Sequence, residues 1–136
     1  MREGEERGWD WDEAPLRFAR ARNDIAAVQA LLMVELPDTA AFHAQQAVEK
    51  VLKGLLAAAA EPLRRTHNIE ALADLAHPHW PSLVELPFSL VRVDHWYVDT
   101  RYPGGAEATP DASEIAAAAE AIAQLLDRVM SEAGPP

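Results

Sequence analysis

The feature that most constrains the fold is an apolar repeat near the carboxyl end of the chain. Between residues 111 and 130, apolar side chains recur at intervals of three and four. An α-helix turns once in about 3.6 residues, so this spacing places them on one face. The pattern predicts an amphipathic helix, entered through Thr109 and Pro110, that must bury this face against other helices. The members of the repeat are Ile115, Ala118, Ala119, Ile122, Leu125, Leu126 and Val129.

Two further helices are predicted in the first half of the chain. Phe18, Ile25 and Leu32 share a seven-residue spacing, which indicates a helix over about residues 15–34. After Pro37, Asp38 is a suitable N-cap for a second helix that runs to about residue 60. We expect these two helices to form an antiparallel hairpin.

Shorter helices are expected in the middle of the chain, over about residues 68–76 and 88–100. The proline-rich string HPHWP lies between them, and Tyr-Pro-Gly-Gly ends the second of them. The predicted fold class is therefore all-α, as a five-helix, up-and-down antiparallel bundle. With 136 residues we expect one domain: a bundle over residues 14–132, with tails at 1–13 and 133–136.

Composition excludes several classes of site. The chain has no cysteine, which rules out disulfides, thiolate metal sites and a cysteine nucleophile. Its net charge of -10 has the wrong sign for long-range attraction to a phosphate backbone. No apolar run approaches the roughly 20 residues that cross a bilayer, and no hydrophobic signal segment opens the chain. We therefore expect a cytoplasmic protein without a membrane partner.

The second helix has two distinct faces. One is an apolar arc that contains Ala44, Val48, Val51, Leu52, Leu55 and Ala59. The other is a narrow polar arc formed by His43, Gln46, Lys50 and Lys53. This arc is basic and could bind an anion, although a solvated helix face is the more ordinary explanation for its lysines.

A second candidate cluster lies on the expected fourth helix, where Arg92, His95 and Trp96 recur at three and four. An aromatic ring beside arginine and histidine could hold a base or a phosphate, but the more ordinary interpretation is that Trp96 is a core residue and Arg92 a surface charge. None of the five histidines is four residues from another, and the HExxH pattern is absent. No metal site, cofactor or catalytic residue is predicted from these patterns.

The string AFHAQQAVEKVLKGLLAA, residues 41–58, closely resembles the second helix of the HEPN (higher eukaryotes and prokaryotes nucleotide-binding) domain family. RTHNIEALADL at 65–75 resembles the family's third helix, and TRYPGG at 100–105 resembles its Arg-Tyr-Pro motif. The resemblance covers about residues 14–130. It implies a five-helix bundle that commonly dimerises, often beside a small nucleotidyltransferase, in some cases as a toxin–antitoxin pair.

The resemblance also implies which residues to examine. The positions that match the family pattern and could contact a ligand or partner are His43, Gln46, Lys50, Lys53, Thr66, His67, Arg101 and Tyr102. Several HEPN branches are metal-independent ribonucleases with an arginine and a later histidine separated by four to six residues. No arginine of this chain has a histidine at that spacing.

Three functions remain open. The first is a non-catalytic module that forms homo-oligomers and binds a nucleotide or RNA, or docks a nucleotidyltransferase. The second is a divergent ribonuclease in which His43, His67 or His95 transfers the proton and Arg92 or Arg101 contacts the phosphate. The third is a structural or regulatory subunit whose polar arc is an oligomer interface.

Overall fold

The computed structural model describes residues 12–62, 65–81, 83, 86, 92–96 and 110–133. These residues form four α-helices and a helical turn over 92–96, and none of them lies in a strand. The all-α prediction is confirmed. The helices are α2 (Ala14–Met33), α3 (Pro37–Ala58), α4 (Ile69–Ala76) and α6 (Ala112–Ala133).

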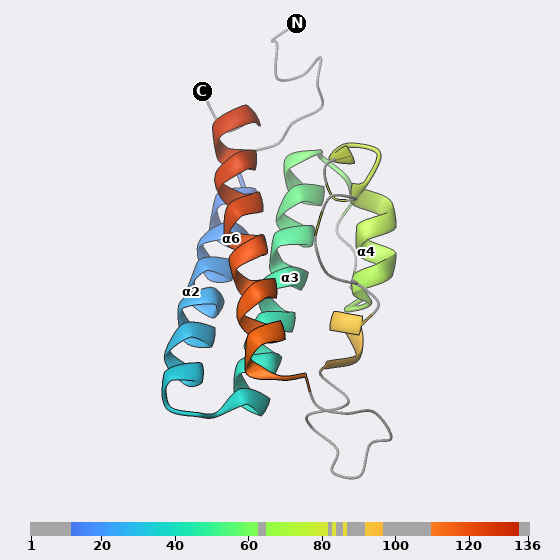
Figure 1. Ribbon diagram of the computed structural model, residues 1–136. Coiled ribbons are helices and arrows are strands. Elements are labelled where there is room, and N and C mark those ends of the chain that lie inside the picture. Colours follow the sequence, from blue (N-terminus) through green and yellow to red (C-terminus); the bar gives the residue numbers. More distant parts are fainter. Residues whose placement is uncertain are drawn as a thin grey trace, which may run out of the picture.

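The three long helices lie side by side, and α4 packs on the opposite side of α3 from α2 (Figure 1). α2 and α3 run antiparallel and form the most extensive helix pair, while α6 contacts both of them. α3 is therefore the central helix, in contact with each of the other three. Side chains on α3 can reach both α2 and the segment that precedes α4.

The connection between α2 and α3 differs in detail from the prediction. α3 begins at Pro37 with Leu36 at the N-cap position, so Asp38 lies in the first turn and the N-cap prediction for it is wrong. The fixed φ of proline suits a first helical position, and a carboxylate in the first turn interacts favourably with the helix dipole. α2 ends through Glu35, whose φ of 60° lets the N–H of Leu36 bond the carbonyl of Leu31 over 2.9 Å.

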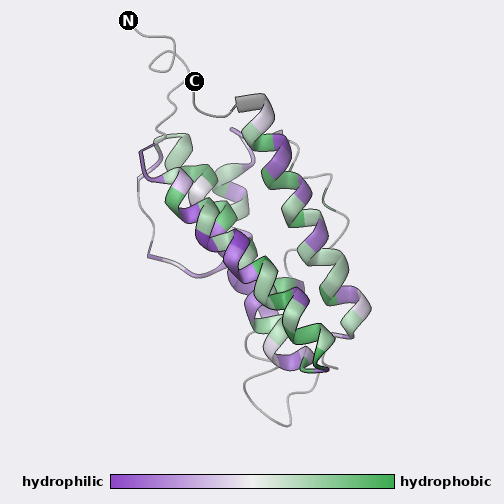
Figure 2. Ribbon diagram, turned by 90° about the vertical axis from the view of Figure 1, so that its left-hand side faces the viewer, coloured by the Kyte–Doolittle hydropathy of each residue, from purple (hydrophilic) through white to green (hydrophobic). Residues whose placement is uncertain are grey.

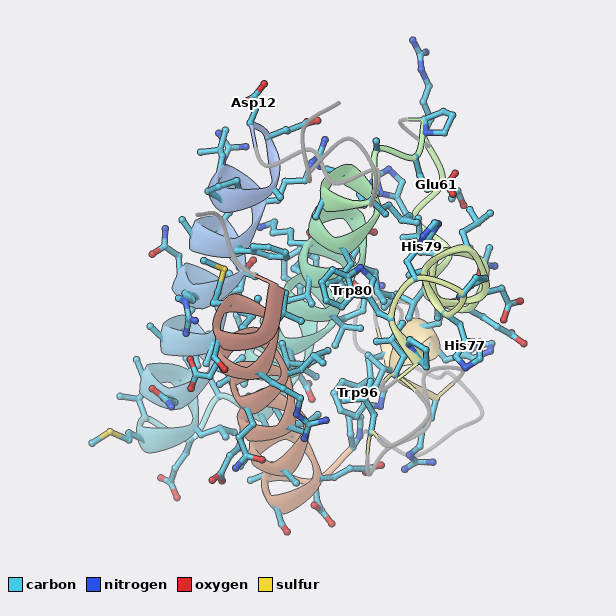
Figure 3. The ribbon with its side chains drawn as sticks, turned by 90° about the horizontal axis from the view of Figure 1, so that it is seen from above. Asp12, Glu61, His77, His79, Trp80 and Trp96 are labelled. Atoms are coloured by element: carbon cyan, nitrogen blue, oxygen red, sulfur yellow. The ribbon has the colours of Figure 1, made fainter. Side chains whose placement is uncertain are left out.

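The core consists largely of the residues whose burial the periodicity predicts. All seven members of the α6 repeat are buried, and so is the apolar arc of α3 apart from the half-buried Ala59. Trp80 and Trp96 are also buried, and both lie among the helices in the view from above (Figure 3). The indole Nε1 of Trp80 donates to the carbonyl of Leu55 over 3.3 Å, which ties the segment after α4 to α3. Trp96 is thus a core residue.

The outer surfaces of the helices also bear on function. Within the described residues, no helix combines the length and apolarity needed to cross a membrane. α6 carries charged or amide side chains on its outer surface at Glu120, Gln124, Asp127 and Arg128, as expected for a helix with one solvated face. Its Asp127 accepts a hydrogen bond of 3.0 Å from Arg22, which links α6 to α2 at the surface.

Candidate ligand and partner site on helix α3

The polar arc of α3 is only partly exposed. His43, Gln46, Lys50 and Lys53 are all half-buried, because α3 lies between α2 and the segment leading into α4. The Lys50 side chain is 30% exposed and that of Lys53 only 12%. These are the only two lysines in the chain. Partial burial of both ammonium groups requires nearby acceptors, and the structure supplies two carboxylates.

The first carboxylate belongs to Asp24 on α2. Its side chain is 10% exposed, and Oδ2 accepts a hydrogen bond of 2.5 Å from Nζ of Lys50. Its other oxygen, Oδ1, lies 2.9 Å from Nδ1 of His43. Since His43 and Lys50 are two turns apart on α3, a single carboxylate from α2 positions both side chains.

The second carboxylate is Glu49, which is on α3 itself and is 7% exposed. Its Oε1 lies 3.1 Å from Nδ1 of His67, in the segment before α4. Its Oε2 lies 3.7 Å from Nζ of Lys53, one helical turn further along. A glutamate four residues before a lysine is the favourable order for such a pair on a helix. Glu49 therefore connects Lys53 to the start of α4.

These contacts form two carboxylate-centred clusters at α3, Asp24 with His43 and Lys50, and Glu49 with Lys53 and His67. Because Glu49 and Lys50 are adjacent in the chain, we refer to the two clusters together as the histidine–carboxylate–lysine network. The charges of the two carboxylates and the two ammonium groups sum to zero. An ammonium has three N–H donors, so each lysine keeps donors beyond the one directed at its carboxylate. The network can offer positioned donors to a polar ligand without a large local charge.

The remaining predicted site residues lie partly beside the network and partly outside the described residues. Gln46 bonds its neighbour Gln45 side chain to side chain over 3.1 Å, next to the network. The hydroxyl of Thr66 accepts a hydrogen bond of 3.1 Å from the N–H of Asn68, which shapes the turn into α4. Arg101 and Tyr102 lie outside the described residues. Of the family-pattern positions, the structure thus places His43 and Lys50 around Asp24, and Lys53 and His67 around Glu49.

The cluster around Arg92 makes contacts that hold helices together. Arg92 forms a two-point ion pair with Glu114 at the start of α6, with 3.1 Å between Nη2 and Oε1. Asp94 accepts a hydrogen bond of 3.1 Å from the N–H of Ile69, the first residue of α4. His95 is exposed. The turn over 92–96 therefore joins α4 to α6.

The two histidines near α4 differ in their surroundings. Nε2 of His79 lies 2.7 Å from Oε1 of Glu61, and His77 is exposed beside Pro78 (Figure 3). Among the residues that the structure describes, no three histidine or acidic side chains gather in a way that could hold a metal ion. The His79–Glu61 contact joins the start of the α3–α4 connection to the segment after α4.

Sequence reasoning missed both carboxylates of the site, Asp24 and Glu49. Asp24 sits on the helical arc of the buried residues Ala21, Ile25 and Val28, where a carboxylate is unusual. An acid at the edge of an apolar arc signals that a basic partner faces it from another helix. That signal is readable in the sequence, but its partners are 19 and 26 residues away.

The comparisons with known proteins identify a family. The HEPN domain model matches residues 14–129, which span the described helices almost completely. Neither the curated proteins nor the solved structures contain a match. The match includes both carboxylates and all four basic members of the network. The chain therefore belongs to the HEPN domain family.

Proposed function

We propose that this HEPN domain is a non-catalytic binding module, which forms a homo-oligomer and either binds a nucleotide or short RNA or docks a small nucleotidyltransferase. The observation that carries this proposal is the network on α3, where Asp24 and Glu49 hold both lysines of the chain together with His43 and His67. Family membership supports a nucleotide-related role in general terms. The polar network is the part of the described surface best suited to it.

Phosphate chemistry fits the donors of the network. A phosphate oxygen accepts charge-assisted hydrogen bonds from ammonium and imidazole N–H groups. The buried carboxylates restrain those donors before a ligand arrives, which lowers the entropy lost on binding. The same carboxylates offset the lysine charges, and the net charge of -10 opposes an approaching anion. We therefore expect modest affinity that depends on geometry more than on net attraction.

A protein partner would use the same surface differently. An acidic domain associates fastest with a partner that presents basic groups. A small nucleotidyltransferase with a basic face would meet the domain's acidic surface while its polar groups contact the network. If the two chains form a toxin–antitoxin pair, this contact is the one that would control the active member.

Calorimetry tests ligand binding directly. We expect the wild-type protein to bind ATP, GTP or a short single-stranded RNA, and Lys50→Gln and Lys53→Gln to weaken that binding at least about tenfold. Glutamine still donates a hydrogen bond to Asp24 or Glu49, so the fold is retained while the charge is lost. Arg22→Gln is the matched control, since Arg22 pairs with Asp127 on the α6 side of α2.

Co-purification tests partner docking. The tagged protein is recovered from extract of its own cells, and a nucleotidyltransferase should be retained by wild type and by Arg22→Gln, but less by the two lysine variants. Binding of no ligand in calorimetry, combined with no retained nucleotidyltransferase, would reject the proposed function.

A divergent ribonuclease is the second candidate, and one observation favours it. His43 and His67 each have Nδ1 at a buried carboxylate, which orients the imidazole and leaves Nε2 for proton transfer. Arg92, a candidate phosphate contact, is paired with Glu114. RNA cleavage should then fall in His43→Ala or His67→Ala and persist in His77→Ala. Cleavage unchanged in both of the first two variants, or absent from wild type, would rule this candidate out.

A further inference from the structure

Arg20 on α2 is a cation that the network leaves unused. It is exposed, and it has no hydrogen bond or ion pair among the residues that the structure describes. It lies one helical turn before Asp24, so the two side chains project from the same side of α2. Lys50 and His43 already contact the two oxygens of Asp24. The guanidinium of Arg20 therefore keeps its N–H donors available for a ligand.

The neighbouring arginines of α2 are engaged in ion pairs. Arg17 directs two of its nitrogens at Oε1 of Glu13, one turn earlier on the same helix. Arg22 pairs with Asp127 over 3.0 Å on the α6 side of α2. Arg20 thus differs from both in having no carboxylate of its own.

Arg20 is level with the part of α3 that carries the two lysines. Asp24 meets Lys50 across the contact between α2 and α3. Further along the same contact, the ring of Phe18 lies against Gly54. Arg20 falls between these two points on α2, and the helices run antiparallel, so it is level with the turn of α3 that follows Lys50.

This cation gives the network a local excess of positive charge. Each lysine has its own carboxylate, Asp24 for Lys50 and Glu49 for Lys53. Arg20 adds one further positive charge beside them, in a chain whose net charge is -10. An anion that contacts all three cations is therefore favoured here over the rest of an acidic surface.

The charged part of the α2–α3 contact is short. Residues 25–33, the second half of α2, include no charged side chain, and the turn that follows adds Glu35 and Asp38. Figure 2 shows hydrophilic colouring concentrated in the first half of α2 and hydrophobic colouring toward its end. An RNA strand would extend over these uncharged and acidic surfaces, whereas a few phosphates linked directly to one another would not.

We infer that Arg20, Lys50 and Lys53 form a site for a chain of directly linked phosphates, as in a nucleoside triphosphate or free polyphosphate. A planar guanidinium donates two parallel hydrogen bonds to one phosphate, while an ammonium acts as a point charge with donors in several directions. The phosphates then bridge α2 and α3. The inference rests on the proposed function and specifies its ligand, because the phosphate chain rather than the base supplies the recognised groups.

Calorimetry with AMP, ADP, ATP and inorganic tripolyphosphate tests the ligand class. Affinity should rise with each added phosphate, and both ATP and tripolyphosphate should bind at least about tenfold more tightly than AMP. The tighter of these two identifies the source of the chain, a nucleotide or free polyphosphate. Equal affinity for AMP and ATP, or tighter binding of a short single-stranded RNA than of either, would overturn the inference.

A substitution of Arg20 tests the contact from α2. Arg20→Gln should weaken binding of ATP and tripolyphosphate at least about tenfold, whereas Arg22→Gln removes the same charge two residues away and should change it by less than about twofold. Arg20→Lys keeps the charge but loses the planar fork, so it should recover part of the affinity. Thermal unfolding should stay close to that of wild type, since both arginines are exposed. Equal effects of the two glutamine variants would overturn the role of Arg20.

The two proposals fail in different ways. If ATP or RNA binds and Arg20→Gln leaves that binding unchanged, the inference is wrong and the proposed function stands. The same holds if neither nucleotide nor tripolyphosphate binds while a nucleotidyltransferase is still retained in co-purification. The proposed function itself is rejected only when ligand and partner are both absent.

Discussion

Nζ of Lys50 on α3 donates a hydrogen bond of 2.5 Å to Oδ2 of Asp24 on α2, and these two helices form the most extensive helix–helix contact of the fold. Asp24→Ala would leave Lys50 and His43 half-buried without their acceptor. We expect the free energy of unfolding to fall by about 2–3 kcal/mol, measured by urea denaturation. Asp127→Ala removes the exposed pair with Arg22 and should cost less than about 1 kcal/mol. Equal losses in the two variants would contradict a structural role for the Asp24 contacts.

Gly54 on α3 marks the closest approach of α2. A Cβ placed there would lie 2.4 Å from Cε1 of Phe18, a ring that is almost fully buried. Alanine favours a helix by about 1 kcal/mol over glycine, but overpacking costs about 1–3 kcal/mol. We therefore expect Gly54→Ala to lower stability by about 1 kcal/mol in thermal or urea unfolding.

A smaller side chain at position 18 should relieve that clash. In a double-mutant cycle, the double variant Phe18→Leu with Gly54→Ala should lose less unfolding free energy than the sum of the losses in the two single variants. Strict additivity would show that the ring of Phe18 moves aside at no cost.

The opposite substitution should help at the end of α3. Ala60 has a φ of 58°, in the left-handed region that glycine adopts without strain, and its N–H bonds the carbonyl of Ala57 over 3.0 Å. We expect Ala60→Gly to raise the free energy of unfolding by about 0.5–1 kcal/mol, as the net of relieved strain and a more flexible unfolded chain. Ala59→Gly is the matched control and should be destabilising, because Ala59 has a φ of -84°.

The sequence predicted the helices well because periodicity records which face is buried. The α6 repeat and the apolar arc of α3 depend on residues within one helix, and the structure buries both apart from the half-buried Ala59. The start of α3 was predicted less well, since proline at a first helical position and an aspartate N-cap are competing signals one residue apart.

The candidate site was predicted only in part, for a physical reason. The polar arc of α3 follows from helical spacing, but its counter-charges do not. Asp24 comes from another helix, and pairing it with Lys50 requires knowing how α2 crosses α3. The expected basic surface is consequently a network in which each lysine already has a carboxylate. Whether it binds a ligand depends on the donors that remain.

The rates at which the two lysine side chains are acetylated test whether their remaining N–H groups are accessible. Because Lys50 is 30% exposed and Lys53 12%, we expect limited acetylation, followed by peptide mass spectrometry, to modify Lys50 several times faster. A bound nucleotide should slow both reactions, since its phosphates would cover the remaining N–H groups. A lysine-containing peptide in the same reaction controls for loss of reagent. Lys53 reacting as fast as Lys50 would mean that its contact with Glu49 opens readily, and unchanged rates with nucleotide would place the ligand elsewhere.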